Sequence, residues 1–133
     1  MRVENRVSLW LGTAPNSQAL ADYVRLRYAD DGDIVPSQLM ADFGIDSYDE
    51  NFREAEFLAP EDDRISEILK GFSYDAQVID AYESAVGNVL DSKINAVVLL
   101  YNYDANVEIG QVAGSNGVSL KYYGAVEYEP TYA

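Results

Sequence analysis

The sequence predicts one α+β domain: a mainly antiparallel sheet, helices packed on one face of it, and a β-hairpin at the C-terminal end. Three observations predict this class. A strand-like run comes first, helical periodicities occupy the middle, and at least three strand-like segments follow. The chain has 133 residues and 48% hydrophobic content, which suits a single domain over residues 1–133 with one substantial core.

The first elements are indicated by alternation and by cap chemistry. In the run 6–12, alternate side chains are apolar, as in a strand with Val7, Leu9 and Leu11 on one face. A helix follows, with Asn16 or Ser17 as its cap. Its apolar stripe comprises Leu20, Tyr23, Val24 and Tyr28.

Turn signals dominate the next stretch. Residues 30–33 (Asp-Asp-Gly-Asp) are typical of a turn. Ser37 is a plausible cap for a short helix that runs through Phe43, and Gly44 suits its C-terminal stop. Residues 45–58 are ambiguous between a strand and a short helix.

Two more helices are expected before the final strands. Pro60 and the three acids after it are typical of a helix start, and Gly71 would end that helix. Ser73 is a candidate cap for the longest helix, residues 74–92. Its broad apolar stripe comprises Val78, Ile79, Tyr82, Val86, Val89 and Leu90.

The last third of the chain is expected to be β-structure. Residues 94–103 are apolar at nearly every position, which predicts a central strand buried on both faces. Segments 107–112 and 118–128 flank the turn-like residues 113–117 and form a hairpin signal. Gly124 indicates a bulge or a close backbone approach. Alternation places one set of side chains on a common face: Val118, Leu120, Tyr122, Val126 and Tyr128.

Composition excludes several function classes. The chain carries 23 acidic and 9 basic residues, a formal charge of −14, and neither His nor Cys. It therefore has no imidazole or thiolate nucleophile, no disulfide framework and no zinc-finger ligands. The charge repels phosphate backbones, so no nucleic-acid binding is expected.

The longest apolar stretch is too short for a membrane helix, and cytoplasmic residence is the default expectation.

Most of the negative charge lies in residues 30–63. This segment contains twelve acidic residues and a single basic residue, Arg53, so its net charge is −11. Apolar residues interleave with the acids, so a core can anchor the segment while its carboxylates face out and steer a basic partner. The alternative interpretation is a solvated, solubilising stretch. The candidate partner-binding residues are Asp30, Asp31, Asp33, Asp46, Tyr48, Asp49, Glu50, Glu54 and Glu56.

Eleven tyrosines also favour binding over catalysis, because tyrosine is enriched at protein interfaces. Tyr23, Tyr28 and Tyr82 fall on helical stripes and are expected to be half-buried. Periodicity constrains three others less and leaves them available for the surface. These are Tyr48, Tyr74 and Tyr123.

Catalytic and metal-binding motifs lack their context. Residues 42–44 match the Asp-Phe-Gly triplet of protein kinases, but no glycine loop or catalytic Asp-Asn loop accompanies them. Residues 30–33 do not form an EF-hand calcium loop. If Gly32 were the invariant glycine of such a loop, Asp31 would be the only calcium ligand among the ligand positions that precede it. Pairs among the acids at 49, 50, 54 and 56 keep a carboxylate- or metal-dependent enzyme as a minor alternative. No cofactor is expected.

Five segments form an ordered set that spans most of the chain. They are Val7-Ser8-Leu9-Trp10-Leu11-Gly12, Asp42-Phe43-Gly44-Ile45, Tyr48-Asp49-Glu50-Asn51-Phe52, Leu69-Lys70-Gly71-Phe72-Ser73-Tyr74 and Leu120-Lys121-Tyr122-Tyr123-Gly124. This set resembles the immunity protein 22 family of bacterial polymorphic toxin systems. The resemblance implies an intracellular, non-enzymatic protein that binds and neutralises a cognate toxin, which is encoded beside it and has a basic surface.

The predicted function is therefore toxin neutralisation through an acidic, aromatic-containing surface. Structural roles are expected for Trp10, Gly12, Phe43, Gly44 and Phe52, with an exposed anchor as the alternative for Trp10. The rival functions are an acidic adaptor or decoy that binds basic proteins generally, and the carboxylate enzyme. No oligomeric state is predicted.

Overall fold

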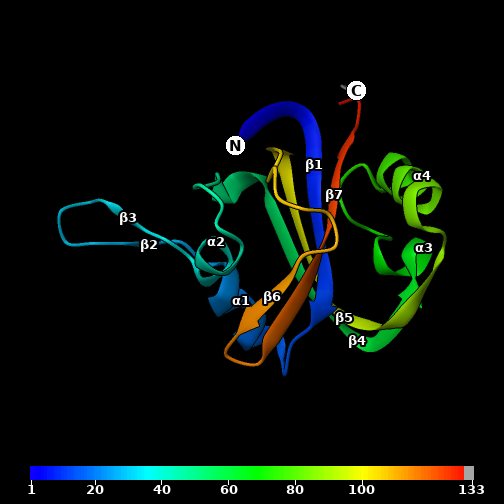
Figure 1. Cartoon of the computed structure of the whole chain (residues 1–133), viewed down its shortest axis with the longest axis horizontal. Helices are drawn as coiled ribbons and strands as arrows, with labels where there is room; N and C mark the ends of the chain where they lie inside the picture. The colour runs from blue at the N-terminus through cyan, green and yellow to red at the C-terminus, as the bar shows by residue number, and fades with distance from the viewer. Residues whose placement is uncertain (131–133) are drawn as a thin grey trace.

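A five-stranded antiparallel sheet with the strand order β4-β5-β1-β7-β6 forms the centre of the molecule (Figure 1). The computed structural model describes residues 1–130. It confirms a single α+β domain with a C-terminal hairpin. The sheet strands are β1 (Arg2–Thr13), β4 (Arg53–Arg64), β5 (Val89–Tyr103), β6 (Val112–Ser115) and β7 (Val118–Glu127).

The remaining elements are short and lie outside this sheet. A separate two-stranded hairpin consists of β2 (Arg27–Tyr28) and β3 (Ile34–Val35). The helices are α1 (Ser17–Val24), α2 (Gln38–Phe43), α3 (Ile65–Ile68), α4 (Asp75–Val86) and the 3₁₀ turn η1 (Glu50–Phe52).

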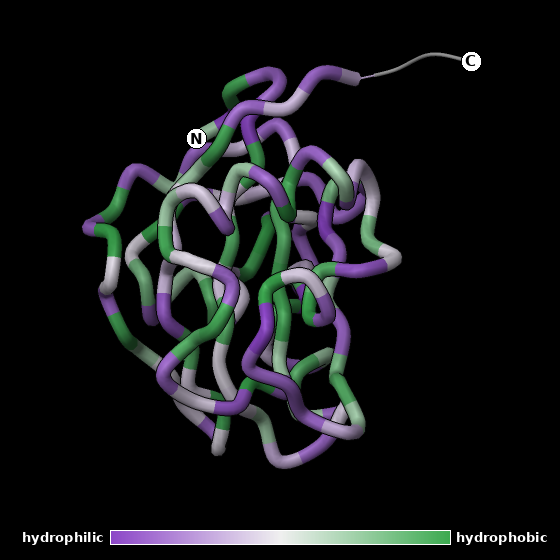
Figure 2. The backbone as a smooth tube through the Cα atoms, turned by 90° about the vertical axis from the view of Figure 1, so that its right-hand side faces the viewer, coloured by the Kyte–Doolittle hydropathy of each residue, from purple (hydrophilic) through white to green (hydrophobic). Residues whose placement is uncertain are grey.

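Helices cover both faces of the sheet, so their expected placement on one face is wrong. α1 and α2 pack on the Trp10 face, and α3 and α4 pack on the Leu9 face (Figure 1). The cause is the sequence of β5, whose residues 96–100 are buried on both sides, as predicted. Figure 2 shows the apolar residues concentrated in the central strands. Trp10 is fully buried against Phe43 and is not an exposed anchor.

Cap chemistry predicts the first two helices well. Asn16 Oδ1 accepts a hydrogen bond from Ala19 N at 2.8 Å, and Ser37 Oγ accepts one from Met40 N at 3.2 Å. Gly44 ends α2 in the left-handed conformation, with φ 65°. However, α1 ends at Val24, so Tyr28 belongs to β2 and not to the helical stripe.

The predicted helix start at Pro60 is wrong. Pro60 lies inside edge strand β4 and follows a cis peptide bond, and residues on either side of it pair with β5. An edge strand tolerates proline because one side of its backbone needs no partner. The helix begins later, at Ile65, and its expected apolar face is buried: Ile65, Ile68 and Leu69.

The longest helix is shorter than its stripe predicts. α4 ends at Val86, where the Gly87 N–H donates to Glu83 O at 2.8 Å, and residues 89–92 already belong to β5. At the other end Tyr74 occupies the cap position, and Ser73 does not cap the helix. Periodicity continued past Gly87 because the first residues of β5 are also apolar.

The C-terminal hairpin is tighter than expected. Its turn is Asn116-Gly117 alone, with φ values of 54° and 85°, so residues 113–115 pair as part of β6 and residues 107–111 precede the strand. Between the pairs Trp10–Tyr122 and Ser8–Ala125, two residues of β7 oppose the single residue Leu9 of β1. This extra residue confirms a bulge at Gly124.

The bulge exchanges the faces of β7. Tyr122 packs in the core of the Trp10 face, whereas Val126 and Tyr128 pack on the Leu9 face. The predicted common face for residues 118–128 is therefore wrong beyond Gly124. The neighbour of Gly124 is a side chain and not another backbone, because a Cβ at this position would lie 3.0 Å from Ile109 Cδ1.

Candidate partner-binding surface

The predicted acids at 30, 31 and 33 lie at the tip of the β2–β3 hairpin, which projects away from the sheet (Figure 1). The turn is closed by the Ala29 N–H, which donates to Asp33 O at 2.8 Å. Asp31 Oδ1 accepts from Asp33 N at 3.0 Å, and Gly32 supplies φ 88°. The predicted turn is confirmed, and it presents carboxylates at an exposed tip.

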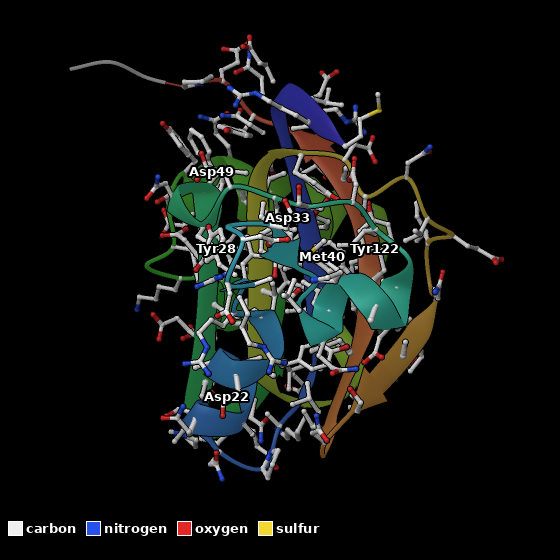
Figure 3. All side chains as sticks on the ribbon, turned by 90° about the vertical axis from the view of Figure 1, so that its left-hand side faces the viewer. Asp22, Tyr28, Asp33, Met40, Asp49 and Tyr122 are labelled. Carbon is white, nitrogen blue, oxygen red and sulfur yellow. The ribbon has the colours of Figure 1, made fainter. Side chains whose placement is uncertain are left out.

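The stem of this hairpin is apolar and exposed. Tyr28 is 63% exposed, Ile34 45% and Val35 38%. Figure 3 shows Tyr28 and Asp33 together on this side of the molecule. Sequence reasoning missed the apolar stem because it assigned Tyr28 to a helix. The signal that would have found it is the turn motif itself, flanked by Arg27-Tyr28 and Ile34-Val35.

Tyr48 is only 6% exposed, so its expected availability at the surface is wrong. Its hydroxyl donates to Val24 O, the last carbonyl of α1, and Ser37 Oγ lies 2.8 Å away. Burial raises the pKa of the Tyr48 phenol. The side chain therefore connects α1 to α2 and offers little area to a surface contact.

Asp46 is held by two donors. The Tyr103 hydroxyl donates to Asp46 Oδ1 at 2.5 Å, and the Met1 ammonium lies 2.9 Å from the same oxygen. The hydrogen bond from Tyr103, followed by that from the N-terminus, lowers the pKa of this carboxyl. Its negative charge is partly balanced within the chain.

Asp49 and Glu50 both support local structure. Asp49 caps η1, because its Oδ1 accepts from Asn51 N at 2.9 Å. Glu50 pairs with Arg53 at 3.2 Å, and the same guanidinium nitrogen donates to Val24 O at 3.1 Å. Asp49 keeps its net charge at the surface, whereas Glu50 is neutralised by its partner.

Glu54 and Glu56 lie on edge strand β4. Ala55 and Phe57 pack on the Trp10 face, so alternation directs the two glutamates to the Leu9 side. Glu54 accepts hydrogen bonds from Ser73 N and Ser73 Oγ, both at 3.0 Å. Charges on an edge strand also discourage pairing with another chain. The structure thus distributes the predicted residues over the hairpin tip, the η1 region and this edge.

This arrangement suits recognition better than metal chemistry. Within residues 1–130, no three carboxylates converge closely enough to hold a metal ion. The β2–β3 hairpin instead combines exposed apolar side chains with charges that have no opposite charge beside them. In protein interfaces, apolar anchors of this kind supply affinity, and charges at the rim speed association. No helix in the described part of the chain is long and apolar enough to cross a membrane.

Comparison with known proteins points to one family. The sequence model of the family Immunity protein 22 matches residues 7–129. No curated protein and no solved structure matches the chain. The match extends from the central strand β1 to the residue after Tyr128, and so includes every element from α1 to β7. This chain therefore belongs to the Immunity protein 22 family, whose members are typically non-enzymatic and whose name implies toxin neutralisation.

Proposed function

We propose that this chain neutralises its cognate toxin by stoichiometric binding, with the β2–β3 hairpin as the main contact and a basic surface on the toxin as its target. The observation that carries this proposal is the exposed apolar stem beside three aspartates on a projecting element. No other segment of residues 1–130 joins an aromatic side chain as exposed as Tyr28 to such a charged tip.

The physical roles of stem and tip differ. A tyrosine buried at the centre of an interface supplies large area at low entropic cost, and such anchors carry most of the affinity. The aspartates act at longer range, because a negative field accelerates encounter with a basic partner. Asp49 lies on the same side of the molecule (Figure 3) and extends the negative surface. Reversing Asp49 and Glu50 to lysine is expected to slow association, most clearly at low salt.

The experiment uses the toxin domain encoded beside this gene and measures binding kinetics and protection of cells. Tyr28→Ala is expected to raise Kd about tenfold or more, mainly through faster dissociation. Asp30→Asn, Asp31→Asn and Asp33→Asn combined are expected to lower the association rate and flatten its salt dependence. Ile109→Ala is the matched control, since Ile109 is 70% exposed but lies outside the hairpin.

The possible outcomes test the proposed toxin-binding function and the proposed contact surface separately. Failure of the wild-type chain to bind the neighbouring toxin would overturn the proposed function. Tight binding that Tyr28→Ala leaves unchanged would keep the function and overturn the hairpin as its contact. Equal losses in Tyr28→Ala and Ile109→Ala would also count against the hairpin, because they would show no preference for it.

A further inference from the structure

A cavity of about 500 Å³ lies where the ends of β1, β5 and β7 meet the segment before α4. Four aromatic side chains line it: Phe52, Tyr74, Tyr101 and Tyr128. Two carboxylates, Glu4 and Glu54, line it as well. Among the described residues of its lining, none is Lys or Arg. We refer to these six residues as the aromatic pocket.

The three tyrosines are in mutual contact. The ring centroids of Tyr74 and Tyr128 are 4.9 Å apart, those of Tyr101 and Tyr128 5.6 Å, and those of Tyr74 and Tyr101 6.2 Å. Tyr101 and Tyr128 meet at 90°, so their faces point in different directions. Aromatic rings carry negative π-faces that attract a cation, and these three rings line the same cavity.

Hydrogen bonds fix this arrangement in advance. Tyr101 OH donates to Ser73 O at 2.8 Å, and Ser73 in turn donates to Glu54. Tyr128 OH donates to Asn102 Oδ1 at 2.9 Å, which also accepts from Asn5 N at 3.0 Å. A pocket held in place this way loses little entropy when it is filled.

Three residues of the pocket wall adopt the left-handed backbone conformation, which asparagine tolerates and tyrosine adopts rarely. Asn5, Tyr74 and Asn102 have φ values of 63°, 57° and 55°, in the left-handed region. That conformation is unusual for an aromatic residue such as Tyr74, and it places this ring beside the other two. Strain of this kind is concentrated at sites where geometry serves a ligand.

The aromatic rings and carboxylates of the wall favour a cation, and one of these rings already contacts a cation of this chain, Arg2, which does not itself line the cavity. The guanidinium carbon of Arg2 is 5.8 Å from the centroid of the Phe52 ring. A guanidinium is planar, stacks on aromatic rings and donates in a fork to a carboxylate. The Glu54 carboxylate accepts two hydrogen bonds from Ser73, and its remaining lone pairs can accept hydrogen bonds from a guanidinium.

We propose that the aromatic pocket receives an arginine side chain of the bound toxin. The inference rests on the proposed function, since the arginine comes from the neutralised partner. It adds a second anchor, independent of the β2–β3 hairpin, that explains why an inhibitor of a basic protein would combine tyrosines with carboxylates. The segment 48–52 and the segment 69–74, which carry part of the family resemblance, both supply residues to the pocket wall.

The first test needs no toxin. N-acetyl-arginine amide is titrated into the purified chain while the aromatic ring signals are followed by NMR. The expected result is saturable, millimolar binding that shifts the Tyr74 ring, and no such shift with N-acetyl-citrulline amide, which has the same shape without the charge. Equal responses to both compounds, or no response to either, would overturn the pocket as a cation site.

The second test uses a matched pair of variants with the toxin. No hydrogen bond of the described residues uses the Tyr74 hydroxyl, so Tyr74→Phe is expected to leave Kd within about twofold. Tyr74→Leu keeps apolar bulk but removes the π-face, and it is expected to weaken binding about tenfold. Glu54→Gln is expected to act in the same direction. Circular dichroism establishes that each variant is folded.

The results distinguish the two proposals. If the toxin binds and Tyr74→Leu has the affinity of Tyr74→Phe, the arginine pocket is wrong and the toxin-binding function stands. If the wild-type chain does not bind the toxin, the proposed function fails and so does the toxin arginine as occupant. A response to the arginine compound in that case would retain only a cation-binding pocket with a different occupant.

Discussion

At the scale of single residues, Gly12 shows how closely the central strands approach. A Cβ at this position would lie 1.9 Å from Ser119 O on β7, far inside van der Waals contact. Gly12→Ala is therefore expected to destabilise the fold by about 3 kcal/mol, the upper end of the cost of overpacking. Denaturant unfolding measures this change in the free energy of unfolding.

Gly32→Ala is the control for Gly12→Ala. No atom lies within 4 Å of the added methyl in the hairpin turn, so only the left-handed φ of 88° opposes it. The expected cost is about 1 kcal/mol. Similar costs at both glycines would show that backbone conformation matters more than the close approach of β1 to β7.

Residue-scale exposure was the weakest part of the prediction from sequence. Charge and turn chemistry are local, so the carboxylates at the hairpin tip were predictable. Tyr28 and Tyr48 were not, because their burial depends on where neighbouring elements end: α1 stops before Tyr28, while α1 and α2 together enclose Tyr48. The pocket tyrosines come from three distant segments, and only the fold brings them together.

At the scale of elements, α4 is fastened to the sheet at the β7 bulge. The Tyr82 hydroxyl lies 2.7 Å from Gly124 O and 3.1 Å from Val7 O, and it donates to this pair of carbonyls. Tyr82→Phe leaves buried acceptors with one donor fewer, so a loss of about 1–2 kcal/mol in the free energy of unfolding is expected. Thermal and denaturant unfolding test this.

The matched change for Tyr82→Phe is Tyr28→Phe, which removes a hydroxyl from an exposed ring and is expected to leave stability within about 0.5 kcal/mol. Protection of the α4 amides from hydrogen exchange should fall in Tyr82→Phe. Unchanged protection would mean that apolar packing alone holds this helix.

Elements defined by side-chain caps were predictable, and those defined by special backbone geometry were not. Ser37 and Gly44 bound α2 through their own chemistry. Pro60 follows the helix-start pattern, yet it lies in a strand because pairing with β5 determines that segment. The bulge at Gly124 was anticipated as a feature, but its consequence, the exchange of faces, follows only from the register with β1.

At the scale of the whole molecule, burial of tyrosine dominates the response to pH. The chain has no His or Cys that would titrate near neutrality, whereas several of its phenols are buried. Burial raises the pKa of Tyr23, Tyr82, Tyr101 and Tyr103 above the ordinary value of 10.0, and nearby Asp42, Glu54 and Asp46 add to the effect at Tyr23, Tyr101 and Tyr103.

The sign of the pH dependence follows from these raised values. A phenol whose pKa is higher in the folded state stabilises the fold fully below its unfolded pKa, and that stability is lost as pH rises above about 10. The tyrosines are therefore expected to leave the free energy of unfolding level from about pH 6 to about pH 9 and to make it fall steeply by about pH 11. Absorbance at 295 nm should show these phenols still protonated at pH 10 in the folded chain, and ionising together when it unfolds. Tyr103→Phe removes one phenol with a raised pKa and should make the decline in stability shallower. If all eleven tyrosines instead titrated together near pH 10 without unfolding, this account would be contradicted, because the fold would not shield them.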